Sequence, residues 1–182
     1  SSVALVREAY LRAQDYGEPR VLFSAHGLPE TIVKAGDPYQ WQCQRTVEAL
    51  VAALDLPELD WVGCYQSRVG PLKWIEPATE DEVRRAAAER KPLIVVPMAF
   101  VSEHSETLVE IGMEYRDLAL ENGVPFFASV PTVAAAPPFI AGLAGLVRDA
   151  ALRPPGICSA RGDRYCPSGF AGCPIQASGE GA

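Results

Sequence analysis

The sequence predicts an α/β protein whose parallel sheet of four strands is covered by helices on both faces. Four short apolar runs are rich in Val, Ile and Phe, which is typical of strands that are buried on both sides. These runs are residues 20–25, 60–65, 93–100 and 126–130. Helical patterns separate them, and this alternation favours parallel strands that are joined by helices.

Local signals predict the helices on either side of the second strand. Residues 1–14 form an amphipathic pattern ahead of the first strand. Pro38 suits the first turn of the next helix, whose predicted buried stripe consists of Val47, Leu50, Val51 and Leu54. Thr79 and Glu82 have the spacing of a capping box and predict the start of the helix that precedes the third strand.

The helix after the third strand is predicted to start at Ser102 or Ser105 and to end near Gly123. On a helical wheel its buried face consists of Leu108, Ile111, Tyr115, Leu118 and Ala119. Its opposite face carries Glu106, Glu110, Glu114, Asp117 and Glu121. A last helix is expected over residues 138–152.

Composition and charge limit the functional classes. The chain has 182 residues, the size of one ordinary domain, and a net charge of -7. This charge argues against nucleic acid as a partner, because binding phosphates needs a basic face. No apolar run reaches the roughly 20 residues of a membrane-spanning helix, and the N-terminus lacks the pattern of a cleavable signal peptide. We therefore expect a cytoplasmic protein.

Polar segments follow three of the predicted strands. His26 follows the first strand, Gln66, Ser67 and Arg68 follow the second, and His104 follows the third. Ligands of open parallel sheets bind beyond the carboxyl ends of the strands. The sequence therefore predicts a binding site where these loops meet at one edge of the sheet.

Histidine and carboxylates in this region favour metal chemistry. The chain has only two histidines, and Glu106, Glu110 and Glu114 recur every four residues just after the second one. Imidazole and carboxylate together suit divalent metals such as Fe(II), Zn or Co, and a row of acids attracts cations. Like charges at this spacing cost a little helix stability. The alternative is that the acids form an ordinary solvated helix face.

The loop at residues 65–74 mixes cationic, polar and aromatic groups. Arg68 is suited to pairing with a carboxylate, and Trp74 is suited to stacking on a flat ring. A structural loop that is anchored by its tryptophan is the alternative.

The five cysteines fall into two groups. Cys43 and Cys64 lie inside a predicted helix and a predicted strand, where small buried thiols are common. The other three, in the tail, are Cys158, Cys166 and Cys173. In a reducing compartment such a cluster more often binds metal or is inert than forms disulfides. A zinc or iron–sulfur site usually needs a fourth ligand, and no fourth ligand is evident.

Three motifs resemble one enzyme family. The segments FSAHGLP, YQSRVGPLKWIEPAT and FVSEHSETLVE, in this order, are similar to the C-terminal half of ferrochelatases, which insert Fe(II) into a porphyrin. The resemblance implies a Rossmann-like (chelatase-like) domain at residues 19–153. It further implies that residues 1–18 are a connecting helix from a missing N-terminal half and that residues 154–182 are an irregular cysteine-containing tail.

The resemblance also implies roles for the site residues. His26 would accept pyrrole protons or ligate the metal, and Glu106 would face it across the porphyrin. The implied metal contacts are His26, Glu106, Glu110 and Glu114, of which the last two form an acidic path. The implied supporting residues are Glu103 and His104. The implied substrate-binding residues are Gln66, Ser67, Arg68 and Trp74.

Cofactors and partners follow from the same resemblance. Fe(II) would be the substrate metal, and some relatives hold a [2Fe-2S] cluster, here implied on Cys158, Cys166 and Cys173. The implied partners are a porphyrin, either protoporphyrin or coproporphyrin, and the N-terminal half. Peripheral membrane contact and self-association are further predictions. The alternatives are a non-catalytic metal- or haem-binding domain and a cobalt or nickel chelatase.

Overall fold

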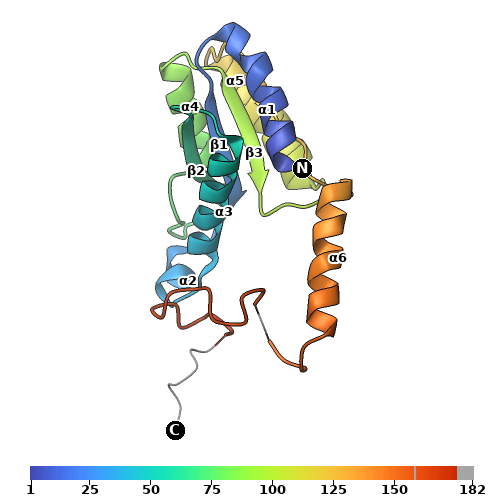
Figure 1. The fold of residues 1–182 in the computed structure, drawn as a ribbon. Helices are drawn as coiled ribbons and strands as arrows, with labels where there is room; N and C mark the ends of the chain where they lie inside the picture. Colours follow the sequence, from blue (N-terminus) through green and yellow to red (C-terminus); the bar gives the residue numbers. More distant parts are fainter. Residues whose placement is uncertain (158, 176–182) are drawn as a thin grey trace.

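Four parallel strands form the sheet. The computed structural model describes residues 1–157 and 159–175 (Figure 1). The strands are β1 (Arg20–His26), β2 (Asp60–Gln66), β3 (Leu93–Met98) and β4 (Phe127–Ser129), in the order β2-β1-β3-β4. All neighbouring strands pair in parallel, which confirms the predicted sheet.

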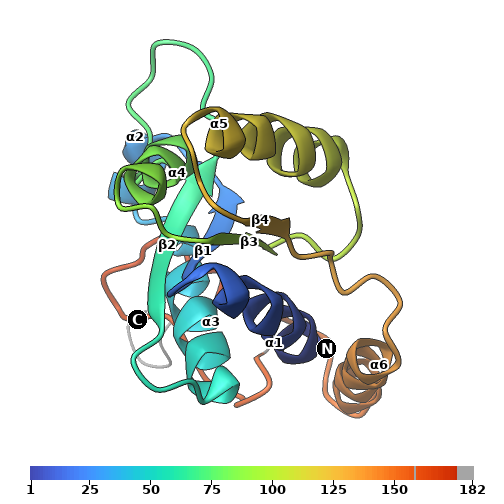
Figure 2. The same cartoon turned by 90° about the horizontal axis from the view of Figure 1, so that it is seen from above.

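Helices cover both faces of the sheet, as predicted (Figure 2). One face carries α1 (Ser2–Ala13) and α3 (Tyr39–Leu54). The other face carries α4 (Thr79–Ala88), η2 (Glu106–Tyr115) and α5 (Arg116–Glu121). The remaining helical segments are η1 (Gln14–Tyr16), α2 (Glu30–Lys34) and α6 (Pro137–Ala151).

The central strand β1 contributes to an apolar cluster on each face. Val21 and Phe23 belong to the cluster beneath α1 and α3, whereas Leu22 belongs to the cluster beneath α4 and α5. Successive side chains of a strand point to opposite faces, so the stretch from Val21 to Phe23 between the two helical layers must be apolar at every position. This requirement explains why β1 lacks an alternating polar pattern.

Helix α1 is part of the domain core. Val6, Ala9 and Ala13 are buried in the same cluster as β1 and β3. Within residues 1–18, the predicted connection, α1 therefore packs on the sheet. Its link to a preceding half stays a prediction, as do the boundaries drawn at residues 19–153 and 154–182.

The start of α4 differs from the expected capping box. Thr79 is the first residue of the helix, and Ala78 holds the N-cap position without a side-chain hydrogen bond. The Thr79 hydroxyl is buried, lies 2.7 Å from Ser24 Oγ and donates to Cys64 Sγ over 3.3 Å. The capping-box prediction is wrong because partners on β1 and β2 engage this hydroxyl inside the core.

The helix after β3 begins as a π-helix, η2. Its buried residues Thr107, Ile111 and Tyr115 recur every four positions, and the wider turn of a π-helix, with its i→i+5 hydrogen bonds, holds them on one face. Leu108 is 57% exposed, so its place in the predicted α-helical stripe is wrong. Ala119, in the α-helix that follows, is buried as predicted.

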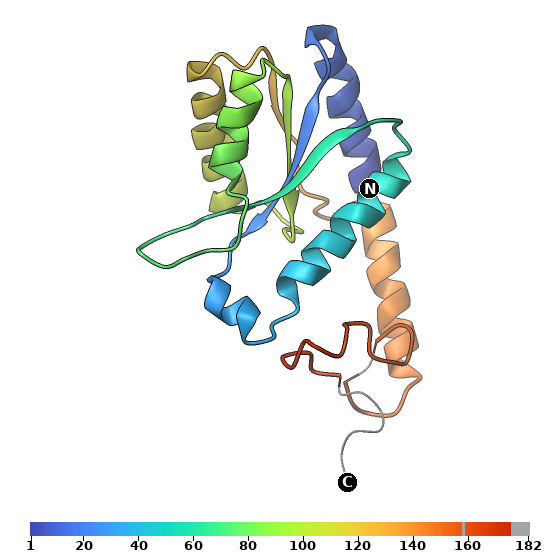
Figure 3. The same ribbon diagram turned by 90° about the vertical axis from the view of Figure 1, so that its left-hand side faces the viewer.

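Helix α6 projects away from the sheet (Figures 1 and 3). None of its residues is buried. Its exposed large apolar side chains are Ile140, Leu143, Leu146 and Val147. No helix of the described residues has both the length and the apolar character that are needed to cross a membrane.

The tail packs against the connection between α2 and α3. The Gly172 N–H donates to the Gly36 carbonyl over 3.0 Å, and the Trp41 ring contacts the rings of Tyr165 and Phe170. A Cβ on Gly36 would lie 2.8 Å from a backbone nitrogen of the tail, so this close approach requires glycine. Residues 159–175 contain no helix or strand, as predicted for the tail.

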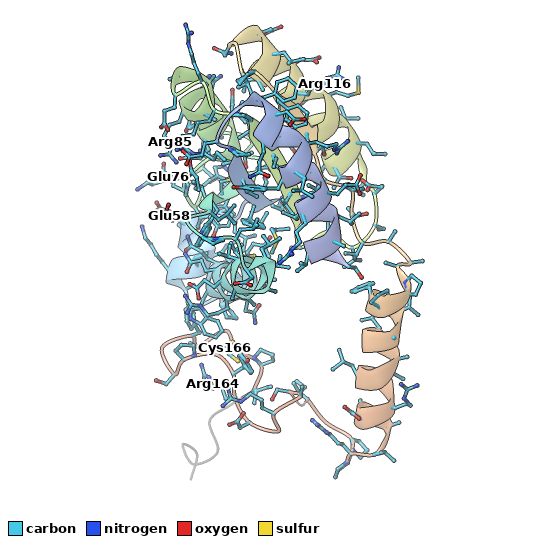
Figure 4. All side chains as sticks on the ribbon, turned by 45° about the horizontal axis from the view of Figure 1, so that its top comes forward. Glu58, Glu76, Arg85, Arg116, Arg164 and Cys166 are labelled. Carbon is cyan, nitrogen blue, oxygen red and sulfur yellow. The ribbon has the colours of Figure 1, made fainter. Side chains whose placement is uncertain are left out.

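Within the tail, Arg164 holds the chain around Cys166 (Figure 4). Its guanidinium donates to the backbone carbonyls of Cys166, Pro167 and Phe170, over 2.9, 2.9 and 2.6 Å. One fixed side chain thereby satisfies several carbonyls that no regular secondary structure pairs.

A buried ion cluster closes the amino end of the sheet. Arg20 exposes only 5% of its surface, and its Nε donates to both carboxylate oxygens of Asp60, over 3.0 and 3.1 Å. Its Nη2 donates to Glu89 over 2.7 Å. Burial alone would raise the pKa of Asp60, but hydrogen bonds from Arg20 and Lys91 outweigh burial and lower that pKa.

We expect Asp60→Asn to lower the free energy of unfolding at pH 7 by about 2–3 kcal/mol, because it leaves a buried guanidinium undercompensated. Since the folded-state pKa of Asp60 is lowered, its contribution is present above the unfolded-state pKa and is lost as the pH falls through the folded-state value. The difference between wild type and variant should therefore shrink below about pH 4.

Urea unfolding across this pH range measures the effect. Glu80→Gln, which breaks an exposed pair with Arg84, is the matched control and should change stability little. Equal losses in the two variants would contradict the role assigned to the buried cluster.

Candidate active site

The site residues lie where the carboxyl ends of the strands meet. β1 ends at His26 and β2 ends at Gln66, and these two residues are partners in the parallel register. β3 runs into a loop that leads to η2, which begins at Glu106. The predicted meeting of the three loops at one edge is therefore confirmed.

Glu106 lies between the two histidines. Its Oε1 is 3.5 Å from His26 Nδ1, and its Oε2 is 3.6 Å from His104 Nδ1. The exposed fractions of the side chains are 41% for His26, 31% for Glu106 and 61% for His104. The group is therefore open to a ligand.

The described residues contain no set of three His, Cys, Asp or Glu side chains that is arranged to hold a metal ion. His26 and Glu106 are thus a pair of potential ligands, and a metal bound there would need further ligands from another molecule.

The backbone around His26 is fixed from two sides. The Tyr39 hydroxyl donates to the His26 carbonyl over 3.0 Å, and the Gly27 N–H donates to the Gln66 carbonyl over 2.8 Å. Burial is the main cause that raises the pKa of Tyr39, so its hydroxyl keeps the proton that it donates. A Cβ on Gly27 would lie 2.9 Å from the Gln66 carbonyl oxygen, which excludes larger residues.

Glu103 ties the start of η2 to the segment after β4. Its Oε1 accepts from the Thr132 N–H over 2.8 Å and from the Thr132 hydroxyl over 3.0 Å, and its Oε2 accepts from Thr107 over 2.7 Å. Burial alone would raise the pKa of Glu103, but these hydrogen bonds lower it. Glu103 therefore lies beside the site, next to His104, and its carboxylate holds the start of η2 to the segment after β4.

Glu110 is also occupied by the protein. It accepts hydrogen bonds from the side chains of Gln66, Ser67 and Tyr115 and from the Ser67 backbone N–H. Gln66 exposes only 1% of its surface. We expected Gln66 to contact substrate, but its amide lies beneath the site because partners within the protein take up its hydrogen-bonding groups.

A polar cavity of about 410 Å³ opens beside Ser67 and Glu110. Its charged lining residues are Arg68, Glu80, Glu110, Glu114, Asp117 and Glu121. Glu114 and Arg68 are exposed. A cavity lined mainly by carboxylates concentrates cations. A path for metal or protons along Glu110 and Glu114 stays a prediction.

Trp74 is buried against the loop that follows β1. It is 9% exposed, and its Cε3 would lie 3.2 Å from a Cβ placed on Gly27. Its indole N–H has no hydrogen-bond partner among the described residues. The tryptophan therefore anchors the loop beside His26, and stacking on a substrate stays a prediction.

Two of the three tail cysteines lie together. Cys166 and Cys173 are buried, and their thiols interact with each other. Burial is the main cause that raises the pKa of Cys166, whereas a hydrogen bond from the Ile175 backbone lowers the pKa of Cys173. Cys158 lies outside the described residues.

The two remaining cysteines are core thiols, as predicted. Cys43 and Cys64 are both buried. Burial raises the pKa of Cys64 to about 12. Burial also raises the pKa of Cys43, so both thiols remain protonated and are poor metal ligands.

Sequence reasoning missed several residues of the site framework. Tyr39 and Thr132 were not singled out, and Tyr115 was expected only in the apolar stripe. Tyr39 and Thr132 act through polar groups whose partners lie on other elements, for example 29 residues away for Thr132 and Glu103, whereas Tyr115 bonds to Glu110 on its own helix. Periodicity carries no signal for such pairs, although a Tyr or Thr near a strand end is a weak hint.

Comparisons with known proteins agree with the motifs. The sequence model of the ferrochelatase family matches residues 2–151. The ferrochelatase of Caulobacter vibrioides is 48% identical over 172 residues, which cover 94% of this chain and 49% of that protein. The ferrochelatase of Phenylobacterium zucineum is 57% identical over 141 residues, which cover 77% and 40%. The chain thus spans about half the length of the curated relatives it matches.

A solved structure is similar at the level of the fold. The crystal structure of "Putative cobalamin (vitamin B12) biosynthesis CbiX protein" from Marinobacter aquaeolei VT8 has a TM-score of 0.53 and 15% identity, and covers 74% of this chain and 98% of that one. This similarity confirms the predicted fold class alone. The match over residues 2–151 and the identity to several ferrochelatases go further, and they establish that the chain belongs to the ferrochelatase family.

Proposed function

We propose that this chain is the C-terminal half of an enzyme that inserts Fe(II) into a porphyrin. The observation that carries the proposal is the pair of His26 and Glu106, 3.5 Å apart at the open edge of the sheet, in a member of this family. We place the enzyme in the cytoplasm, and peripheral membrane contact remains a prediction.

The reaction releases two pyrrole protons and places Fe(II) on the four ring nitrogens. His26 and Glu106 are the groups that would take these protons or hold the incoming metal, because both are accessible and paired. His104, 3.6 Å from the other oxygen of Glu106, would help to orient that carboxylate. Since no three protein ligands converge in the described residues, the macrocycle itself would complete the metal's ligand set.

The loops beside the pair fit a flat, apolar substrate with charged edges. Ile32 on α2 and Leu72 on the loop after β2 are exposed apolar side chains, and apolar walls are typical of small-molecule sites. Arg68 is an exposed cation near Ser67 that would pair with a propionate. Both protoporphyrin and coproporphyrin carry such groups.

We expect His26→Ala and Glu106→Gln to lower Fe(II) insertion at least about a hundredfold, because each removes a group that exchanges protons with the substrate. The measurement is anaerobic insertion into protoporphyrin, followed by absorbance. The protein is the joined enzyme, meaning this chain together with the first half that its relatives contain. Glu8→Gln, an exposed carboxylate on α1, is the matched control.

The alternatives make different predictions in the same assay. Porphyrin binding without metalation in the joined enzyme would favour a non-catalytic haem- or metal-binding domain. Insertion of cobalt or nickel but not of iron would favour a chelatase for those metals.

A second part of the proposal concerns the N-terminal half. Helix α6 has no buried residue, and four large apolar side chains lie exposed along it. Apolar surface of this kind marks an interface. The family relatives are about twice as long as this chain, so the first half is the proposed partner for α6.

We therefore expect this chain alone to self-associate and to lack insertion activity, whereas the joined enzyme is active and does not self-associate through α6. Light scattering over a wide concentration range measures association. Leu143→Ser with Leu146→Ser in the isolated chain should suppress it, because both side chains are exposed on α6. A monomeric wild-type chain at all concentrations would rule out self-association.

A third part concerns a [2Fe-2S] cluster on Cys158, Cys166 and Cys173. The adjacent thiols of Cys166 and Cys173 support it, and the first half would supply the remaining ligand. When bound, the cluster would hold the tail on the α2–α3 connection, because both thiols belong to the packed part of the tail.

Cys166→Ser in the joined enzyme should remove iron, acid-labile sulfide and the visible absorbance of the cluster. Cys43→Ala, which alters a buried core thiol, should leave all three readouts unchanged. Equal cluster content in wild type and Cys166→Ser would show that Cys166 is not a ligand.

A further inference from the structure

Glu110 lies in a different environment from Glu106 and Glu114, the acids four residues before and after it. Its Oε1 accepts hydrogen bonds from the Ser67 N–H and the Tyr115 hydroxyl, each over 2.7 Å. Its Oε2 accepts from Gln66 Nε2 over 3.0 Å and from Ser67 Oγ over 2.5 Å. An ionised carboxylate has about four lone-pair sites, so these donors use the full capacity of Glu110.

The saturation of Glu110 argues against a place on a path for metal or protons. An incoming cation would first have to displace one of the four donors, two of which come from buried residues, Gln66 and Tyr115. Burial is the main cause that raises the pKa of Tyr115, and its bond to Glu110 adds to it. The tyrosine therefore donates at neutral pH.

Gln66 connects Glu110 to the backbone at Glu106 and to the backbone next to His26. Its Nε2 donates to the Glu106 carbonyl over 3.1 Å as well as to Glu110. Its Oε1 accepts from Ser24 over 2.8 Å, and its backbone carbonyl accepts from the N–H that directly follows His26. One buried residue thus hydrogen-bonds to the backbone of Glu106 and to the backbone of Gly27, which follows His26.

Ser67 adds a second constraint. Its φ is +60°, a left-handed conformation that costs free energy in a non-glycine residue. Both its N–H and its hydroxyl bond to Glu110, so the carboxylate offsets the cost and fixes the first residue after β2.

We propose that Glu110 is a positioning residue that locks β2 to η2 and thereby sets the separation between His26 and Glu106. This assignment rests on the proposed function of that pair and deepens it. Charged hydrogen bonds in a buried network are strong and depend on one another. Loss of one acceptor should therefore loosen the whole connection between the two elements.

The test compares Glu110→Gln, Ser67→Ala and Tyr115→Phe in the joined enzyme, with Glu8→Gln as the control for loss of an exposed carboxylate. The lock predicts that Glu110→Gln lowers kcat by about tenfold or more, while the KM for Fe(II) changes less than about threefold. Ser67→Ala and Tyr115→Phe should lower kcat in the same sense, although neither removes a charge.

A role in metal transfer predicts the opposite pattern. Glu110→Gln would then raise the KM for Fe(II), excess Fe(II) would restore the rate, and Ser67→Ala and Tyr115→Phe would behave like wild type. That set of results would overturn the proposal.

Amide hydrogen exchange supplies a readout that does not depend on activity. The lock predicts that exchange at Ser67 and Gly27 becomes about tenfold faster or more in Glu110→Gln and Tyr115→Phe, but not in Glu8→Gln. Unchanged exchange at both amides would refute the lock even if insertion is slow.

If the wild-type joined enzyme inserts no metal, the proposed function fails. The exchange rates of Ser67 and Gly27 alone then decide whether the lock exists. If Glu110→Gln does not fold, Tyr115→Phe decides it.

Discussion

Parallel pairing of β1 between β2 and β3 is the constraint on which the rest of the structure depends. Parallel strands require crossover connections, and these connections place helices on both faces of the sheet. The same pairing brings the carboxyl ends of all three strands to one edge. The sheet register therefore brings His26, the Gln66 loop and the entry to η2 to the same edge.

Behind that edge lies a polar network inside an apolar core. Ser24, Thr79 and Gln66 are almost fully buried. The Ser24 hydroxyl on β1 donates to the Gln66 side chain on β2 and lies 2.7 Å from the Thr79 hydroxyl on α4. Buried polar groups are costly unless every one is paired. A network of this kind tolerates little displacement, so it holds the ends of β1 and β2, where His26 and Gln66 lie, in place.

The unpaired surfaces of the chain point to a larger assembly. Inside the sheet, apolar residues are covered on both faces, whereas α6 has no covering element among the described residues. The chain spans about half the length of its relatives, and we propose that the first half of such a protein is the partner of α6. In this proposal the same partner covers α6 and encloses the porphyrin.

The sequence by itself determined the strands, most helices, the sheet edge that carries the site, and the family. These follow from apolar periodicity and from motifs that are contiguous in the chain. Only the tertiary structure decided that η2 is a π-helix, that the Thr79 hydroxyl has its partners inside the core, and that Gln66 donates a hydrogen bond to Glu110. The physical reason is separation along the chain. Gln66 and Glu110 are 44 residues apart, and whether a carboxylate is free or saturated depends on which distant donors the fold brings to it.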